Sequence, residues 1–306
     1  MSASTGTTTS TNTGTAPSRG RTAHPGGRPG SLATAIRLAP SRIGYEVRGY
    51  FRQGDTVFFT FLFPVLMLAL FSSIFSGDLS PAGLTGDPAN GTDTVSMSTY
   101  YLAGMVAAGL LLSGVQNLAI DIAQEKYNGR LKRLGGTPMS PVTYFLGKLG
   151  QVFVTGVLQA ALTISVGVLA FGASLPTDAG SWLTFAWVFV LGLTGSALLG
   201  VALSSVPRSG RSAGAVVIPV VLALQFISGV YVASFQLPES VQHLANLFPL
   251  AWLARGMRSV FLPDDFASLE LGDSWNLGQG ALVLAAWLIV GFVASRLTFR
   301  WNRRDA

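Results

Sequence analysis

The sequence contains no cysteine and only two histidines, and this scarcity limits the chemistry that the chain can perform. Without cysteine there is no disulfide framework, no thiol nucleophile and no cysteine-based metal site, and His24 and His243 offer little for a histidine-based site. The sequence also lacks an HExxH zinc motif and a GxxxxGK[ST] phosphate-binding loop. We therefore expect a protein that is not an enzyme and that holds no metal and no cofactor of its own.

Charge is scarce as well, because Asp, Glu, Lys and Arg make up 11 % of the chain against about 25 % in soluble domains. The mean hydropathy of +0.49 agrees with this composition. Six uncharged and mainly apolar intervals are each long enough for a helix of about 20 residues to cross about 30 Å of hydrocarbon. We predict an all-α membrane protein with six transmembrane helices, at about 56–77, 98–120, 149–172, 182–206, 213–235 and 275–296.

The distribution of basic residues predicts the orientation of these spans. Six spans place both termini on one face, and all Lys and Arg residues then lie on that face except Arg255 and Arg258. Cytoplasmic loops carry an excess of Lys and Arg, so we expect both termini to be cytoplasmic. The net charge of +6 is then explained by membrane topology, and we expect no nucleic-acid partner.

The region before the first span divides into two parts. Residues 1–35 are rich in Ser, Thr, Gly and Pro, which predicts a disordered cytoplasmic tail. After the tail, Arg42, Arg48 and Arg52 alternate with apolar and aromatic residues, a pattern typical of a helix that lies in the membrane interface. A simple juxtamembrane anchor for anionic lipid is the alternative.

The uncharged intervals that predict the six spans contain no Asp, Glu, Lys or Arg, whereas transporters driven by protons or sodium usually carry ionisable groups near the middle of the bilayer. A pump built from this chain would need energy from a separate subunit. The polar groups inside the spans are amides and hydroxyls, among them Gln116, Asn117 and Gln225. Such groups commonly bridge helices, and contact with a substrate is the second interpretation.

Five charges lie within nine residues, from Glu125 to Arg133, in the longest internal loop on the cytoplasmic face. We expect the loop to continue the second span as a helix until Gly135-Gly136-Thr137-Pro138 ends it. Arg130, Lys132, Arg133 and Lys148 suit an anchor for anionic lipid. Glu125 instead favours docking into another protein.

The loop before the last span holds an uncharged run of 15 residues, 240–254, which is too short to cross a membrane. Its apolar residues have helical spacing, and Pro249 interrupts the run. We therefore expect two short re-entrant helices on the outer face before the last span.

Two motifs in these loops carry a family resemblance. The pattern E-x-x-x-G-x-L-x-x-L-x-x-T-P-x-S, followed by L-G-K, occupies residues 125–148. The outer loop adds Ser228-Gly229, Leu237-Pro238, Pro249 and Arg258. Together they resemble the ABC-2 type transporter permeases, specifically the daunorubicin/doxorubicin-resistance-like exporter permeases of bacteria. The resemblance implies that residues 36–306 form an ABC-2 type transmembrane domain.

In that family the loop after the second helix carries a coupling helix that fits a cleft on an ATPase subunit. The coupling residues implied here are Glu125, Lys126, Tyr127, Asn128, Gly129, Arg130, Leu131, Lys132, Arg133 and Pro138. By the same analogy the first, second and fifth spans line the substrate path, with Gln116, Asn117 and Gln225 as contacts.

The resemblance implies a permease subunit of an ATP-binding cassette exporter in the bacterial plasma membrane, acting in efflux or antibiotic resistance. Its substrate would be a hydrophobic drug-like or lipid-like compound. Its partners would be an ABC ATPase subunit that binds ATP and Mg²⁺, a second permease copy in a homodimer or a related permease in a heterodimer, and membrane lipid. An ABC-2 exporter of polysaccharide or lipid-linked glycan and a non-transporting membrane scaffold are the alternatives.

Overall fold

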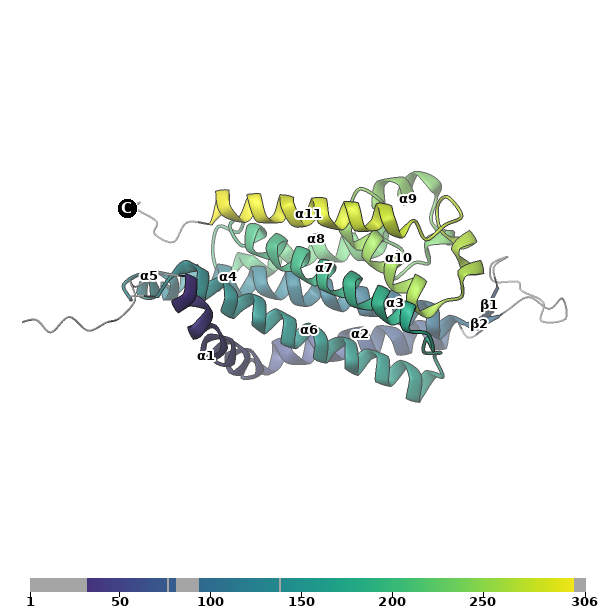
Figure 1. The fold of residues 1–306 in the computed structure, drawn as a ribbon, viewed down its shortest axis with the longest axis horizontal. Coiled ribbons are helices and arrows are strands. Elements are labelled where there is room, and N and C mark those ends of the chain that lie inside the picture. Colours follow the sequence, from purple (N-terminus) through teal and green to yellow (C-terminus); the bar gives the residue numbers. More distant parts are fainter. Residues whose placement is uncertain (1–31, 76, 81–93, 138, 300–306) are drawn as a thin grey trace, which may run out of the picture.

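The computed structural model describes residues 32–75, 77–80, 94–137 and 139–299, and this part of the chain is almost entirely helical (Figure 1). The α-helices are α1 Leu32–Phe51, α2 Gly54–Ile74, α3 Met97–Leu111, α4 Leu118–Tyr127, α5 Arg130–Gly135, α6 Pro141–Phe171, α7 Ala179–Leu203, α8 Ser212–Ile227, α9 Glu239–Ala245, α10 Pro249–Phe261 and α11 Leu277–Thr298. A π-helix, η2 Leu112–Asn117, joins α3 to α4, and η3 Ser234–Gln236 and η4 Asp264–Leu269 are 3₁₀ turns. Two short strands, β1 Asp78–Leu79 and β2 Val95–Ser96, pair antiparallel.

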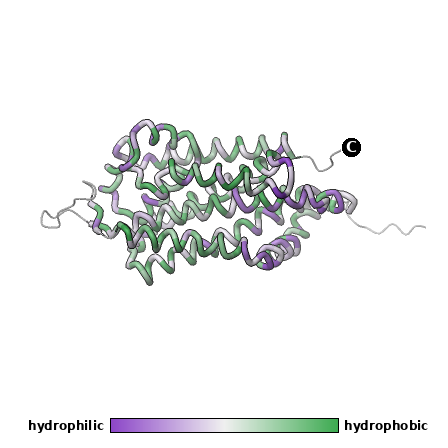
Figure 2. The backbone as a smooth tube through the Cα atoms, turned by 180° about the vertical axis from the view of Figure 1, so that it is seen from behind, coloured by the Kyte–Doolittle hydropathy of each residue, from purple (hydrophilic) through white to green (hydrophobic). Residues whose placement is uncertain are grey.

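The long helices run side by side along the longest axis of the molecule (Figure 1). We call the end formed by α1, α5 and the adjoining ends of α4, α6 and α11 the basic end, and the opposite end, with β1, β2 and α9, the distal end. Hydrophilic residues gather on α1 and α5, whereas the helices between the two ends are mainly hydrophobic (Figure 2). The described chain begins and ends at the basic end.

Five helical units are long and apolar enough to cross a membrane, and they agree with five of the six predicted spans. They are α2, the continuous α3–η2–α4 unit from Met97 to Tyr127, α6, α7 and α11. The remaining span, expected over 213–235, is helical only over Ser212–Ile227, which corresponds to about 24 Å of helix. The helix ends there because Gly229 adopts a left-handed backbone with φ of 73°. The all-α membrane fold is confirmed, and six full-length spans are not.

Local sequence signals explain where the long helices begin and end. Ser140 caps α6 by accepting a hydrogen bond from the backbone N–H of Thr143, and Pro141 occupies the first helical position, where a missing N–H is harmless. Gly172 ends the same helix in the left-handed conformation that glycine adopts without steric cost. Asp178 caps α7 by accepting from the N–H of Ser181, which is the ordinary role of a carboxylate at a helix start.

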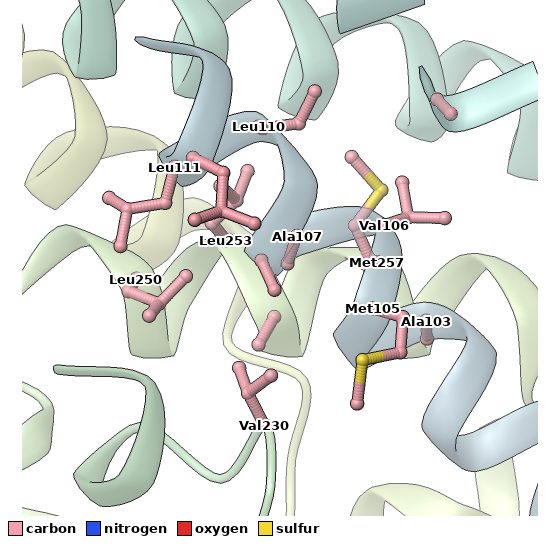
Figure 3. Packing of buried hydrophobic residues seen from close by; sticks show 14 of the residues in the cluster. Ala103, Met105, Val106, Ala107, Leu110, Leu111, Val230, Leu250, Leu253 and Met257 are labelled. Carbon is pink, nitrogen blue, oxygen red and sulfur yellow. The ribbon is translucent and has the colours of Figure 1, made fainter. Parts of the chain in front are cut away.

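The core lies around α3, every residue of which is buried. α3 packs on α2, α6 and α10, and α10 also packs on α7 and α11. Figure 3 shows Leu250, Leu253 and Met257 of α10 close to the apolar side chains of α3. Two short helices, α9 and α10, therefore precede the last span as expected, and their placement in the outer leaflet stays a prediction.

Candidate functional site

A cluster of charged side chains is buried at the basic end, where α1, α4 and α6 meet. Its centre is Lys148 of α6, whose side chain is 1 % exposed. The Lys148 ammonium donates hydrogen bonds to Glu46 at 2.8 Å, Asp121 at 2.5 Å and Glu125 at 3.1 Å. A buried ion needs several such partners, because desolvation of a single charge costs several kcal/mol. The cluster therefore ties three helices together at one point.

Further groups complete the neutralisation of this cluster. Arg42 forms an ion pair with Glu46, and Arg130 lies 3.5 Å from Glu125. The hydroxyl of Tyr144 donates to Glu125 at 2.8 Å. Glu46, Asp121 and Glu125 lie close enough together to ligate a cation, and the Lys148 ammonium already bonds to all three. Three carboxylates and three basic side chains thus balance one another.

The predicted coupling segment forms a turn rather than a continuous helix, which corrects the expectation from the sequence. α4 ends at Tyr127, and Gly129 takes a left-handed φ of 70° before α5 begins at Arg130. The Asn128-Gly129 pair suits this conformation, because glycine has no Cβ to clash.

The coupling residues divide by exposure. Glu125 and Leu131 are buried, Lys126, Tyr127 and Gly129 are half-buried, and Asn128, Arg130, Lys132 and Arg133 are exposed. The hydroxyl of Tyr127 donates to the carbonyl of Pro207 at 2.5 Å, which fastens the end of α4 to the loop between α7 and α8. Pro138 lies outside the described residues.

Lys148 contradicts one expectation from the sequence. The sequence groups it with Arg130, Lys132 and Arg133 as a lipid anchor, but its burial among three carboxylates removes it from contact with lipid headgroups. The role of Glu46 and Asp121 was also missed. The available signal was the L-G-K triplet at 146–148, which places a lysine directly before the uncharged interval that begins at residue 149.

One cleft of about 370 Å³ between α2, η2 and α8 is lined by Gln116, Asn117 and Gln225. Gln116 and Asn117 are adjacent in the sequence, and Gln225 comes from the distant helix α8. Most of the other lining groups are apolar and include Phe59 and Phe63 of α2 and Leu222 of α8. The buried amide of Gln225 also accepts a hydrogen bond from Tyr231 at 2.5 Å. The structure brings the three amides together, and their contact with a substrate stays a prediction.

A second cavity of about 430 Å³ adjoins this cleft toward the basic end. The two share Thr56, Asn117 and Ile120 among their lining residues. At their junction the hydroxyl of Tyr50 donates to Thr60 at 2.7 Å, and the amide of Asn117 donates to Thr60 at 2.7 Å. Burial raises the pKa of Tyr50 to about 12.

A separate buried ion cluster closes the distal end. Glu270 accepts hydrogen bonds from Arg258 at 2.5 Å and Arg255 at 3.2 Å, both on α10. Arg258 is 1 % exposed, and it also donates to the carbonyl of Gly229, immediately after α8. The sequence pointed to Arg258 through its family motif but gave no indication of Glu270 as its partner.

Comparison with known proteins agrees with this architecture. The family model described as ABC-2 family transporter protein matches residues 84–297. This range includes both buried ion clusters, except for Arg42 and Glu46 of α1. A protein named as transport permease ycf38, from Porphyra purpurea, is 24 % identical over 258 residues, covering 82 % of this chain and 85 % of its own length. The match to the family extends over more than half of the chain. The chain belongs to the ABC-2 family of transporter permeases.

Proposed function

We propose that this chain is the permease subunit of an ABC exporter that moves a hydrophobic drug-like or lipid-like compound out across the plasma membrane. ABC-2 permeases work with an ATPase partner. We further propose that ATP and Mg²⁺ bind to that separate subunit and that two permease copies assemble with it. The basic end then faces the cytoplasm, as the excess of Lys and Arg there favours.

The observation that supports this proposal best is the link between the exposed turn at the basic end and the long helices. α5 presents Lys132 and Arg133 to solvent. Directly before the turn, Glu125 is held by Lys148 of α6 and by Tyr144. Lys148 is bound in turn to Glu46 of α1. A displacement of the α4–α5 turn is therefore transferred to two neighbouring helices.

The same turn is connected to the cleft through continuous helix. α4 follows η2 without a break, and η2 carries Gln116 and Asn117, which line the cleft. A π-helix inside an α-helix often marks a functional site, because its wider turn packs less regularly. We propose that movement of α4 on docking of the ATPase reshapes this cleft and thereby moves the substrate.

The exposed residues of α5 provide the test, because their replacement leaves the buried cluster intact. We expect Lys132→Glu with Arg133→Glu to weaken association with the ATPase by about tenfold or more, since charge reversal at an interface costs several kcal/mol. The measurement is copurification of the tagged permease with its ATPase, followed by substrate-stimulated ATP hydrolysis. Arg296→Glu is the matched control, because Arg296 is exposed on α11 at the same end. Equal association of all three proteins would contradict the coupling role.

A further inference from the structure

The two adjoining cavities, which share Thr56, Asn117 and Ile120 among their lining residues, differ in chemistry. The cleft between α2, η2 and α8 is lined mainly by apolar groups such as Phe59, Phe63 and Leu222. The cavity nearer the basic end is lined by polar and charged groups. Both volumes, about 370 Å³ and about 430 Å³, fall in the range of small-molecule sites. One ligand that spans both would need an apolar part and a polar part.

Two arginines that line the polar cavity have no side-chain partner in the described part of the chain. Arg48, in the last turn of α1, and Arg52, the residue directly after α1, line it and are exposed. Among the residues that the structure describes, neither makes an ion pair or a side-chain hydrogen bond. Arg52 lies beyond the end of α1, and its side chain nevertheless lines the same cavity as that of Arg48.

The carboxylates that also line the cavity are already neutralised. Glu46, Asp121 and Glu125 all bond to Lys148, and Arg42 and Arg130 provide two further positive charges beside Glu46 and Glu125. With these pairs balanced, the charges of Arg48 and Arg52 remain in excess. Asp55, the one carboxylate among the residues that line the apolar cleft, lies in the first turn of α2.

We propose, on the basis of the export function proposed above, that the ligand is an amphiphile with an anionic phosphate-type head. The head pairs with Arg48 and Arg52 in the polar cavity. Its apolar chain passes Asn117 and lies against Phe59 in the cleft. Arginine suits this role because its planar guanidinium binds phosphate and carboxylate oxygens in pairs.

Hydrogen-bonded residues connect the walls of the two cavities: Tyr50 lines the polar cavity and Thr60 lines the apolar cleft. Tyr50, Thr60 and Asn117 bond to one another. Asn117 lines both cavities, so it contacts the ligand where head and chain join. This arrangement separates the ligand proposed here from a purely apolar compound, which would occupy the cleft alone.

The test measures binding of radiolabelled dodecyl phosphate to the full chain in nanodiscs of phosphatidylcholine, with empty discs subtracted. We expect saturable binding. Dodecanol and inorganic phosphate, each of which reproduces only one half of the ligand, should compete at least tenfold more weakly than unlabelled dodecyl phosphate. Dodecyltrimethylammonium, with the opposite charge, should compete as weakly as dodecanol. Equal competition by the cationic and anionic amphiphiles would overturn the proposal.

Matched variants locate the two halves of the ligand. Arg48→Ala and Arg52→Ala should each weaken binding about tenfold, as the loss of a charge-assisted hydrogen bond does, whereas Arg37→Ala in α1 should leave it unchanged. Phe59→Ala should weaken binding, and Phe58→Ala should not, because Phe58 is exposed on α2 but does not line the cleft. All five side chains are exposed, so the variants are expected to fold. Thermal unfolding checks this directly.

Two further arms identify the source of the anion and separate this proposal from the export function. If phosphatidylglycerol added to the discs competes with dodecyl phosphate, the site is assigned to an anionic bilayer lipid. If phosphatidylglycerol does not compete, the site is assigned to a transported amphiphile. Both outcomes support the anionic head. Wild-type binding by the Arg48→Ala, Arg52→Ala double variant would overturn the proposal. Binding is measured without the ATPase, so the result of this test does not depend on the result of the coupling test.

Discussion

Lys148 shows how one buried charge can be stable inside an apolar protein. Moving an ammonium ion out of water costs several kcal/mol, and this cost is recovered only with close partners of opposite charge. Lys148 has three carboxylate partners within 3.1 Å, from α1 and α4, while it belongs to α6. The same contacts therefore fix the relative positions of three helices.

We predict that Lys148→Met destabilises the protein by about 3–5 kcal/mol, because removal of one partner leaves buried charges without compensation. The change is expected to be larger than that for Lys132→Met, which affects an exposed side chain of α5 and should remain within about 0.5 kcal/mol. Thermal and denaturant unfolding of the purified protein in detergent measures both. Adding Glu46→Gln and Asp121→Asn to Lys148→Met should restore part of the loss. Equal stability of the two single variants would show that the cluster is not structurally important.

The sequence indicated that charge near residue 125 mattered, but it could not reveal this arrangement. Glu46, Asp121 and Lys148 come from three segments, and their meeting depends on how α1, α4 and α6 are rotated about their axes. Charge counting treats Lys148 as one more basic residue at a membrane face. Only the packing of the helices shows that it faces inward.

At the scale of elements, hydropathy predicted most of the fold because long uncharged runs have few alternatives in a membrane protein. The expected spans at 56–77, 182–206 and 275–296 agree with α2, α7 and α11 to within three residues at each end. α8 differs because a single left-handed glycine, Gly229, ends it. The π-helix η2 was not predicted, since one extra residue in a helical turn leaves the hydrophobic pattern almost unchanged.

The turn between α4 and α5 is the element on which the proposed coupling depends. Its Gly129 has a φ of 70°, whereas Gly136 at the other end of α5 has a φ of −82°. We predict that Gly129→Ala destabilises the turn by about 1–2 kcal/mol, the cost of a left-handed alanine. Gly129→Asn should cost less, because asparagine tolerates this conformation.

Gly136→Ala is the matched control, because its backbone is right-handed and the nearest atom to the new Cβ would be the Arg133 carbonyl oxygen at 3.4 Å. Hydrogen exchange at the amides of α5 measures the effect, and it should become faster in Gly129→Ala alone. ATPase association should fall in the same variant. If Gly129→Ala and Gly136→Ala exchange at the same rate, the left-handed turn does not determine the position of α5.

At the scale of the whole molecule, the α3–η2–α4 unit is the axis around which the other helices pack. α3 contacts α2, α6, α7 and α10, and η2 contacts α7 closely. The close approach of α7 and η2 is possible because glycines face each other: a Cβ on Gly200 would lie 2.2 Å from the carbonyl oxygen of Gly114. The cleft and the basic end thus lie on a unit whose position is set by contact between backbones.

We predict that Gly200→Ala pushes α7 and η2 apart, because the atom that the new methyl group would meet belongs to the backbone and cannot rotate away. Overpacking of this kind costs about 1–3 kcal/mol, which thermal unfolding measures. Since η2 carries Asn117 at the junction of the two cavities, binding of dodecyl phosphate should weaken in the same variant. Gly278→Ala is the control, as a Cβ there would meet nothing within 4 Å, and both properties should be retained. A Gly200→Ala protein with unchanged stability and binding would show that α7 does not determine the position of η2.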